Sequence, residues 1–349
     1  LRLLATDPLA GREVDELAAA RIRTPSPETA HPLVALVEPA LAFASGDGAA
    51  AAVIDRWLSH PDVWTRAVLR LMRATLYGSA GDTASMCTEL ELAITEFESV
   101  GERAGLAWSL TTLADLRTVH GEFKDAIACL ERAVRLLREL DPADGAVLQR
   151  VWLAETRFRA GDTVRARSEL LELMRTDLGG LPEHHRAGAR LILSDIARRD
   201  GDLADAAEQL RRAGEELDRA PQAEPLLRVS YECAAADLAT DRHDLVAAER
   251  HVAEAFALAV AVPDPTLVAL AVARLARLRS LQGQAATAAE LLGAVHTLLG
   301  SLDAIDCDLA GIAPRLRDEL GEHAYEAAYA RGRDLDDGGA LTLVELHLG

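Results

Sequence analysis

Lysine is nearly absent from this chain, because Lys124 is its only lysine. A phosphate-binding loop of the G-x-x-x-x-G-K-[ST] type needs a lysine behind its glycines, and Lys124 does not lie in such a motif. The chain also lacks a G-x-S-x-G elbow and an H-E-x-x-H helix, which are signatures of serine hydrolases and zinc proteases. We therefore predict that the protein is not an enzyme and that it needs no cofactor.

Metal, redox and membrane signals are missing as well. The four cysteines lie far from any C-x-x-C spacing, which predicts buried, reduced thiols of structural role. Glu183-His184-His185 could begin a metal site, but adjacent histidines without a partner cluster are more often solvated, so we predict no metal. No apolar run approaches the ~20 residues of a membrane span, and the first residues do not form a signal peptide. These absences predict a cytoplasmic protein that does not bind membranes.

Positive charge and aromatic residues are both scarce. The chain carries 37 Lys and Arg against 56 Asp and Glu, a formal net charge of -19, and this field opposes direct binding to a phosphate backbone. Only 4% of the residues are aromatic although 50% are hydrophobic, with Ala and Leu dominating. This composition is typical of closely packed helices, so we predict an all-α fold that does not bind nucleic acid directly.

Turn residues recur along the chain at intervals of 40 residues, with one interval of 42. Five, nine and twelve positions after each turn come a small, a large apolar and a small or apolar residue, which fall on one helical stripe. A further small residue lies seven positions before each turn. The turn residues are Gly81, Gly121, Gly161, Gly201, His243 and Gly283.

This pattern resembles the tetratricopeptide repeat, whose standard period is 34 residues. It predicts a right-handed α-solenoid of helix-turn-helix repeats with a period of about 40 residues, whose first helices line the concave side. His243 fits the series if its backbone is left-handed like that of a turn glycine. We expect residues 1–32 to connect to upstream domains, residues 33–300 to form the array, and residues 301–349 to form a C-terminal helical cap with Gly321 and Gly332 as helix stops.

Residues 81–82, 96–107, 289–294 and 320–333 resemble the C-terminal sensor arrays of large actinomycete transcriptional regulators. These regulators are of the Streptomyces antibiotic regulatory protein type or of the related large LuxR type. The resemblance implies a non-catalytic sensor array that binds a protein or an effector and acts on a DNA reader and a nucleotide-binding switch. Because no helix-turn-helix follows the matching segment, the antibiotic-regulator type with upstream domains is favoured. The alternatives are a structural oligomerisation arm and the small-molecule effector-binding domain of a LuxR-type regulator.

A carboxylate recurs six positions before the turn in four consecutive repeats, at Asp115, Glu155, Asp195 and Asp237. In standard repeats this position faces the concave groove, so stacking predicts an acidic ladder, with Trp108 nearby. The expected partner is a basic protein or peptide or the upstream domains of the same regulator, and a small effector is a further class. The alternative is a solvated helix face, in which Glu155 pairs with Arg159 and Asp195 pairs with Arg198 or Arg199 at helical spacing. Asp115 and Asp237 have no basic residue three or four positions later, so local pairing explains only half of the ladder.

Overall fold

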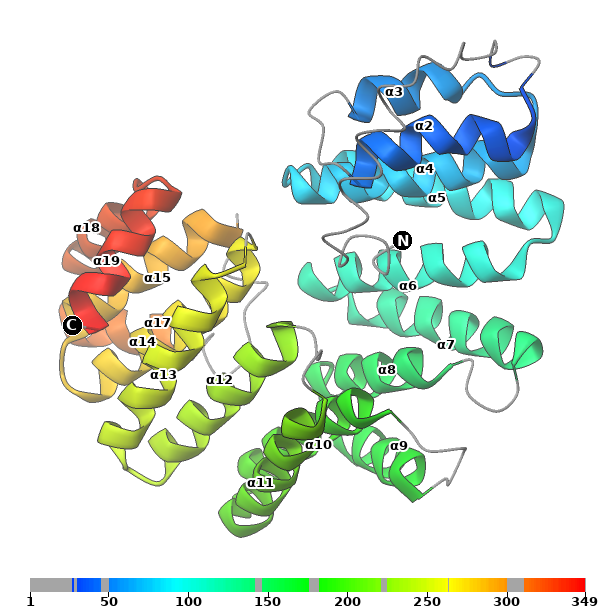
Figure 1. Cartoon of the computed structure of the whole chain (residues 1–349). Helices are drawn as coiled ribbons and strands as arrows, with labels where there is room; N and C mark the ends of the chain where they lie inside the picture. The colour runs from blue at the N-terminus through cyan, green and yellow to red at the C-terminus, as the bar shows by residue number, and fades with distance from the viewer. Residues whose placement is uncertain are drawn as a thin grey trace. The chain divides into compact units, whose positions relative to one another are not determined.

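The computed structural model describes residues 27, 30–44, 50–141, 146–175, 182–220, 225–262, 264–299 and 311–348 (Figure 1). These residues form seventeen α-helices and no strand. The predicted all-α fold of stacked, tetratricopeptide-like helix pairs is therefore confirmed. Most of the predicted connector and Cys307 lie outside the described residues.

The chain divides into two compact units. The first unit contains most of α2 to α7, and the second contains α8 to α19 together with the turn segment Thr118–Lys124. The helices of the first unit are α2 (Pro32–Ala44), α3 (Ala50–Trp57), α4 (Val63–Ser79), α5 (Thr83–Val100), α6 (Arg103–Val119) and α7 (Phe123–Leu140). Those of the second are α8 (Val147–Arg159), α9 (Thr163–Arg175), α10 (Glu183–Arg199), α11 (Leu203–Arg219), α12 (Pro225–Asp241), α13 (Leu245–Val260), α14 (Pro265–Leu281), α15 (Ala285–Leu299), α17 (Ile312–Leu320), α18 (Glu322–Arg333) and α19 (Asp337–Leu348).

The turn residues within the helix pairs share one backbone conformation. All five predicted turn glycines have a positive φ, and His243 adopts the same left-handed backbone with φ of 60°, as predicted. At Gly201 the amide N–H groups of Gly201 and Asp202 donate to the carbonyls of Arg198 and Ala197, a pattern that closes the end of the first helix. The Asp202 carboxylate then accepts from the amide of Asp205 and caps the second helix.

The apolar stripes after the turns form the core between the helices of each pair. From Gly121 onward every predicted stripe residue is buried, and Leu210 is the most exposed of them at 7%. After Gly81 the stripe is less regular, because Met86 stands where the later repeats have a smaller residue and it is only partly buried. The small residue seven positions before each turn is buried in all six repeats because the second helix approaches closely there.

Helices α17 to α19 pack against α15 at the end of the second unit, where Leu316, Tyr325 and Val344 join its core. Gly321 ends α17, as predicted, with φ of 77°. Gly332 was predicted to be a stop, but it lies inside α18. A Cβ on Gly332 would lie 1.8 Å from the Glu290 carbonyl oxygen, and one on Gly293 would lie 2.1 Å from the Tyr329 carbonyl oxygen. The two glycines therefore allow α15 and α18 to cross at backbone distance.

Candidate functional site: the exposed face of the first helices

One face of each first helix stays partly exposed, and we call it the first-helix stripe. It comprises the positions 13, 9, 6 and 2 residues before each turn residue, which share one side of a helix. In α10, Ile192 and Asp195 are partly exposed on this stripe, whereas the adjacent Leu193, Ser194 and Ile196 are buried. The members in the second unit are Leu148, Trp152, Glu155 and Arg159 on α8, Gly188, Ile192, Asp195 and Arg199 on α10, Ser230, Ala234, Asp237 and Asp241 on α12, and Leu270, Arg274, Arg277 and Leu281 on α14.

Asp195 is held by arginines of its own helix. Its Oδ1 accepts from Arg198 Nε at 2.9 Å and its Oδ2 lies 3.0 Å from Arg199 Nη2, so the local pairing considered from the sequence is present. Arg198 also donates to Asp241 on α12 at 2.8 Å, which links two consecutive repeats. Arg199 in turn lies over the Phe158 ring of α8, with its guanidinium carbon 4.5 Å from the ring centroid.

Asp237 is held by the next repeat. Its Oδ2 accepts from Arg274 Nε at 3.1 Å and its Oδ1 accepts from Arg277 Nη1 at 3.0 Å, both on α14. Arg277 also donates to Asp241 at 2.5 Å. Burial by itself would raise the pKa of Asp241, but the hydrogen bonds and charges of Arg198 and Arg277 lower it overall. Three consecutive first helices, α10, α12 and α14, are thus joined by one chain of ion pairs.

The stripe of the second unit is balanced in charge although the whole chain is strongly acidic. Its four carboxylates, on Glu155, Asp195, Asp237 and Asp241, face four guanidinium groups, on Arg159, Arg199, Arg274 and Arg277. The carboxylate oxygens of the two ladder members Asp195 and Asp237 are engaged by arginine in the structure. A basic partner would have to displace these arginines, and contact of the ladder with a partner stays a prediction.

Asp115 and Glu155, the other two ladder members, are exposed on α6 and α8 respectively. Trp108 lies on α6 seven positions before Asp115, so both side chains belong to the same helix face. Trp108 is 51% exposed, in contrast to Trp57, which is fully buried. The structure therefore brings Trp108 and Asp115 together on one exposed strip in the first unit.

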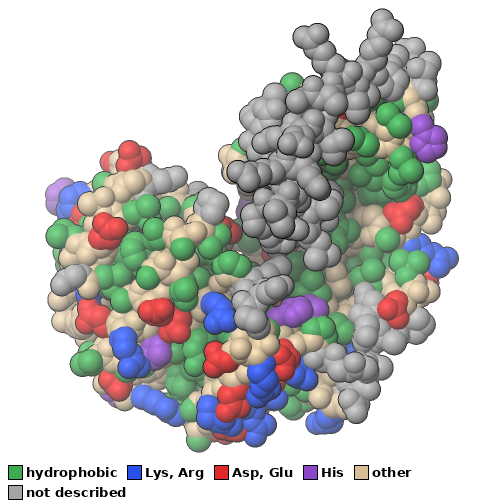
Figure 2. Space-filling model, viewed as in Figure 1, with side chains coloured by type: hydrophobic (Ala, Val, Ile, Leu, Met, Phe, Trp, Pro, Cys, Tyr) green, Lys and Arg blue, Asp and Glu red, His purple; other side chains and the backbone are tan. Residues whose placement is uncertain are grey.

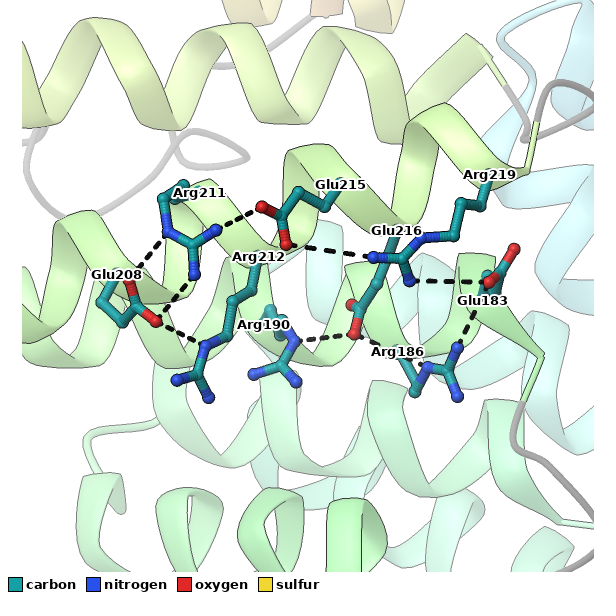
Figure 3. Close-up of polar contacts among 9 residues, drawn as sticks. All are labelled: Glu183, Arg186, Arg190, Glu208, Arg211, Arg212, Glu215, Glu216 and Arg219. Carbon is teal, nitrogen blue, oxygen red and sulfur yellow. Dashed lines mark hydrogen bonds and ion pairs between the residues drawn. The ribbon is translucent and has the colours of Figure 1, made fainter.

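A second set of charges joins a first helix to its own second helix. Arg190 Nε donates to Glu216 at 2.9 Å (Figure 3), and its Nη1 donates to Gln209 at 3.1 Å. The same two contacts recur three repeats earlier, where Arg70 donates to Glu96 at 3.0 Å and to Glu89 at 3.2 Å. Because Glu216 and Glu89 are buried, these pairs hold the helix pair together and do not form a docking surface.

The outer face of α11 carries charges that are solvated. Glu208 pairs with Arg211 and Arg212, and Glu215 pairs with Arg211 and Arg219, all at i, i+3 or i, i+4 spacing (Figure 3). At the lower edge of the view in Figure 2, acidic and basic side chains are correspondingly interspersed. Such exposed pairs are typical of a soluble helix surface and indicate no ligand.

The described residues contain no group of three or more His, Cys, Asp or Glu side chains that could hold a metal ion. His184 and His185 were predicted to be solvated, but they lie in the first turn of α10, and burial, followed by the charge of His184, lowers the pKa of His185 to about 4. Cys129 and Cys233 are buried, as predicted, and burial raises the pKa of Cys233 to about 11, whereas Cys87 is partly exposed.

Among the described helices, none combines the length and the apolar character that crossing a membrane requires. No family model and no curated protein matches the chain. Solved structures do match it. A Rap protein complexed with competence and sporulation factor aligns with a TM-score of 0.58 at 10% identity, over 97% of this chain and 90% of that one. The apo form of RapI aligns with a TM-score of 0.54 at 12% identity, over 97% and 92%. Yeast Tom70 aligns with a TM-score of 0.51 at 14% identity, over 97% of this chain and 62% of Tom70. At these identities the likeness shows the fold alone.

Proposed function

We propose that this chain is a non-catalytic sensor array of a bacterial transcriptional regulator and that it binds a protein or peptide on the first-helix stripe. The observation that carries the proposal is the stripe itself. The second unit has four first helices, α8, α10, α12 and α14, that present residues at the same four offsets, and their buried sides hold them in place. Side chains on such rigid helices can contact an extended ligand with little loss of conformational entropy.

The comparisons support a ligand of this class. The Rap protein, which has the same fold over nearly its whole length, was solved in complex with a factor, the competence and sporulation factor. The regulatory context rests on the resemblance of residues 289–294 and 320–333 to the sensor arrays of actinomycete regulators. In the structure these two segments form the α15–α18 crossing, with Gly293 and Gly332 at its centre, so they act as one structural unit.

Site-specific photo-crosslinking tests the proposal. p-Benzoylphenylalanine is introduced at Trp152 or Ile192 on the stripe, and at Val164 or Val246 on second helices as matched controls, since these are 84% and 82% exposed. After irradiation in an extract of the native cells, adducts are identified by mass spectrometry. Adducts formed from the stripe positions and not from the controls are expected. Equal labelling at all four positions, or no adduct at the stripe, contradicts the proposal.

The regulatory part needs its own measurement. Transcripts are compared between cells that express the native gene and cells in which Ile192 is replaced by Arg, which places a bulky charge on the stripe. A changed set of transcripts, at unchanged protein level, is expected because ligand occupancy no longer reaches the switch. Identical transcripts in the two strains would contradict a role in transcription. The crosslinking result on ligand binding would still stand.

A further inference from the structure

The first-helix stripe of the second unit has a charged half and an uncharged half. The positions six and two residues before each turn residue are all charged except Leu281. The positions thirteen and nine residues before it carry no charge except at Arg274, whose Nε donates to Asp237 at 3.1 Å. Six of these uncharged positions, which we call the uncharged strip, are Trp152 on α8, Gly188 and Ile192 on α10, Ser230 and Ala234 on α12, and Leu270 on α14.

Large apolar side chains lie at both ends of the uncharged strip. Trp152 and Ile192 are partly exposed and pack against one core, which fixes the positions of their exposed sides. Leu270 is also partly exposed and packs against the core of the last repeats. Tryptophan is strongly enriched among the residues that dominate binding energy at interfaces, and apolar groups held by a rigid core lose little entropy when a ligand covers them.

Small residues occupy the middle of the uncharged strip. Gly188 lies inside α10, where glycine is unfavourable. Its φ is not positive, and a Cβ there would meet only Leu227 Cδ2 at 3.5 Å, which is an ordinary contact, so the fold does not require glycine at this position. On α12 the strip continues with Ser230 and Ala234, which are partly exposed. These three residues leave room above α10 and α12 for the backbone of a ligand.

The spacing of the helices gives the length of such a ligand. Each of the first helices α8, α10 and α12 contacts the next one, so the strip covers three steps from helix to helix. Packed helices lie about 8 to 10 Å apart, which makes the strip about 25 to 30 Å long. An extended peptide rises about 3.3 Å per residue and therefore spans it with about eight or nine residues.

We infer that the uncharged strip binds an extended, uncharged segment of a partner protein, with large apolar side chains over Trp152 at one end and Leu270 at the other. Its backbone passes over the small residues between them. The inference rests on the proposed function and adds the length, the charge and the anchors of the ligand.

The charges beside the strip favour an uncharged segment over the basic partner predicted from the sequence. Asp195 and Asp237 are engaged by arginine, so a basic side chain would have to displace a guanidinium group, and an acidic one would have to displace a carboxylate. Covering the apolar ends of the strip breaks no ion pair. A second copy of this chain is a poor occupant, because two chains of net charge -19 repel each other.

Peptide selection tests the inference. Phage-displayed random 12-residue peptides are selected on the full chain, and the affinities of the enriched peptides are measured by fluorescence anisotropy at low salt and at about 0.5 M salt. We expect peptides without net charge that carry two large apolar residues about five to nine positions apart. Salt should change their affinities by less than about twofold, because no ionic contact forms.

Two substitutions on the strip should weaken binding by different means. Trp152→Ala removes an anchor and should weaken it at least about tenfold. Ala234→Leu removes no contact of the free chain, but its side chain occupies the path of the ligand backbone, so we expect a loss of similar size. Ala257→Leu places the same side chain on the exposed surface of α13 and should bind like the unaltered chain. Gly188→Ala should weaken binding severalfold without lowering the urea midpoint, because Ala is the better helix former.

The opposite results overturn the inference. Enriched peptides that are basic and lose affinity in salt do so, as do affinities that Trp152→Ala and Ala234→Leu leave within twofold. A selection that enriches no peptide, or a dimer in sedimentation that Ala234→Leu dissociates, also overturns it. If crosslinked adducts form at Ile192 while the selected peptides are basic, the proposed function stands and this inference fails. If no stripe adduct forms and no peptide is enriched, both fail.

Discussion

The crossing of α15 and α18 allows a sharp test of the structure, because a single methyl group should separate the two helices. A Cβ on Gly332 would lie 1.8 Å from the Glu290 carbonyl oxygen and 2.8 Å from the Ala294 amide nitrogen. Both are backbone atoms, so no side-chain rotation relieves the clash. Gly332→Ala therefore requires the helices to move apart by more than an ångström.

The expected magnitude follows from two opposing effects. Inside a helix, Ala is favoured over Gly by about 1 kcal/mol. Overpacking usually costs about 1 to 3 kcal/mol, and here the separation also loosens Tyr325 and Tyr329, which pack against α15 in the same core. We expect Gly332→Ala to lower the free energy of unfolding of the C-terminal helices by about 2 kcal/mol net.

Hydrogen exchange measured by mass spectrometry is the suitable assay, since repeat arrays open locally and a global melting temperature averages over them. Faster exchange in α15 and α18, with α4 and α5 unchanged, is the expected result. Gly338→Ala on α19 is the matched control: its Cβ would meet only Asp336 Oδ1 at 3.7 Å, so the same substitution should slow local exchange or leave it unaltered. Slower exchange at α15 and α18 in Gly332→Ala would refute the close crossing.

Three further predictions concern charges and turns. In a double-mutant cycle, Asp237→Asn and Arg277→Gln should show a coupling of about 1 to 2 kcal/mol in urea unfolding because the pair is largely buried; additive effects would contradict the pairing. Gly201→Ala should lower the free energy of unfolding by about 1 kcal/mol, because φ there is 83° and L-residues are strained in that region. His243→Ala should lower it by less than about 0.5 kcal/mol, because His243 already bears this strain. Equal losses for the two variants would argue against a left-handed His243. The pKa of His185 is lowered from 6.5 to about 4, so its contribution to stability is complete above pH 6.5 and is lost as the pH falls toward 4. Between pH 7 and pH 5 the urea midpoint of His185→Gln should therefore fall less than that of the unaltered chain, and an equal fall in both would place His185 in solvent.

The repeat geometry could be predicted from the sequence because it depends on local, periodic signals. Each repeat has a glycine at a 40-residue interval, an apolar stripe after it and a small residue before it, and these features indicate a turn, a core-facing helix and a close helix contact. The left-handed φ of His243 could be predicted because His243 occupies the position of the turn glycine. The prediction that Gly332 stops a helix was wrong because it used only the local sequence. A glycine near a helix end looks like a stop, and only the partner helix shows that it serves a close approach.

The partners of Asp237 were missed because only residues three and four positions later were considered. Arg277 occupies the same position as Asp237 one repeat later, 40 residues along the chain, and consecutive first helices bring equivalent positions together. The 40-residue spacing of the repeats therefore already indicated the contact between Asp237 and Arg277. The contribution of Arg274, three residues before Arg277, depends on the direction of a long side chain and could not be predicted from periodicity.

The placement of charge narrows the kind of ligand the array can select. An ionic contact discriminates between partners only where its formation changes the number of unpaired charges. In the second unit, a basic ligand group that approached Asp195 or Asp237 would first have to release an arginine, so the exchange gains little. The acidic net charge can then attract a basic partner from a distance, but the paired acids of the second-unit stripe contribute little to its recognition.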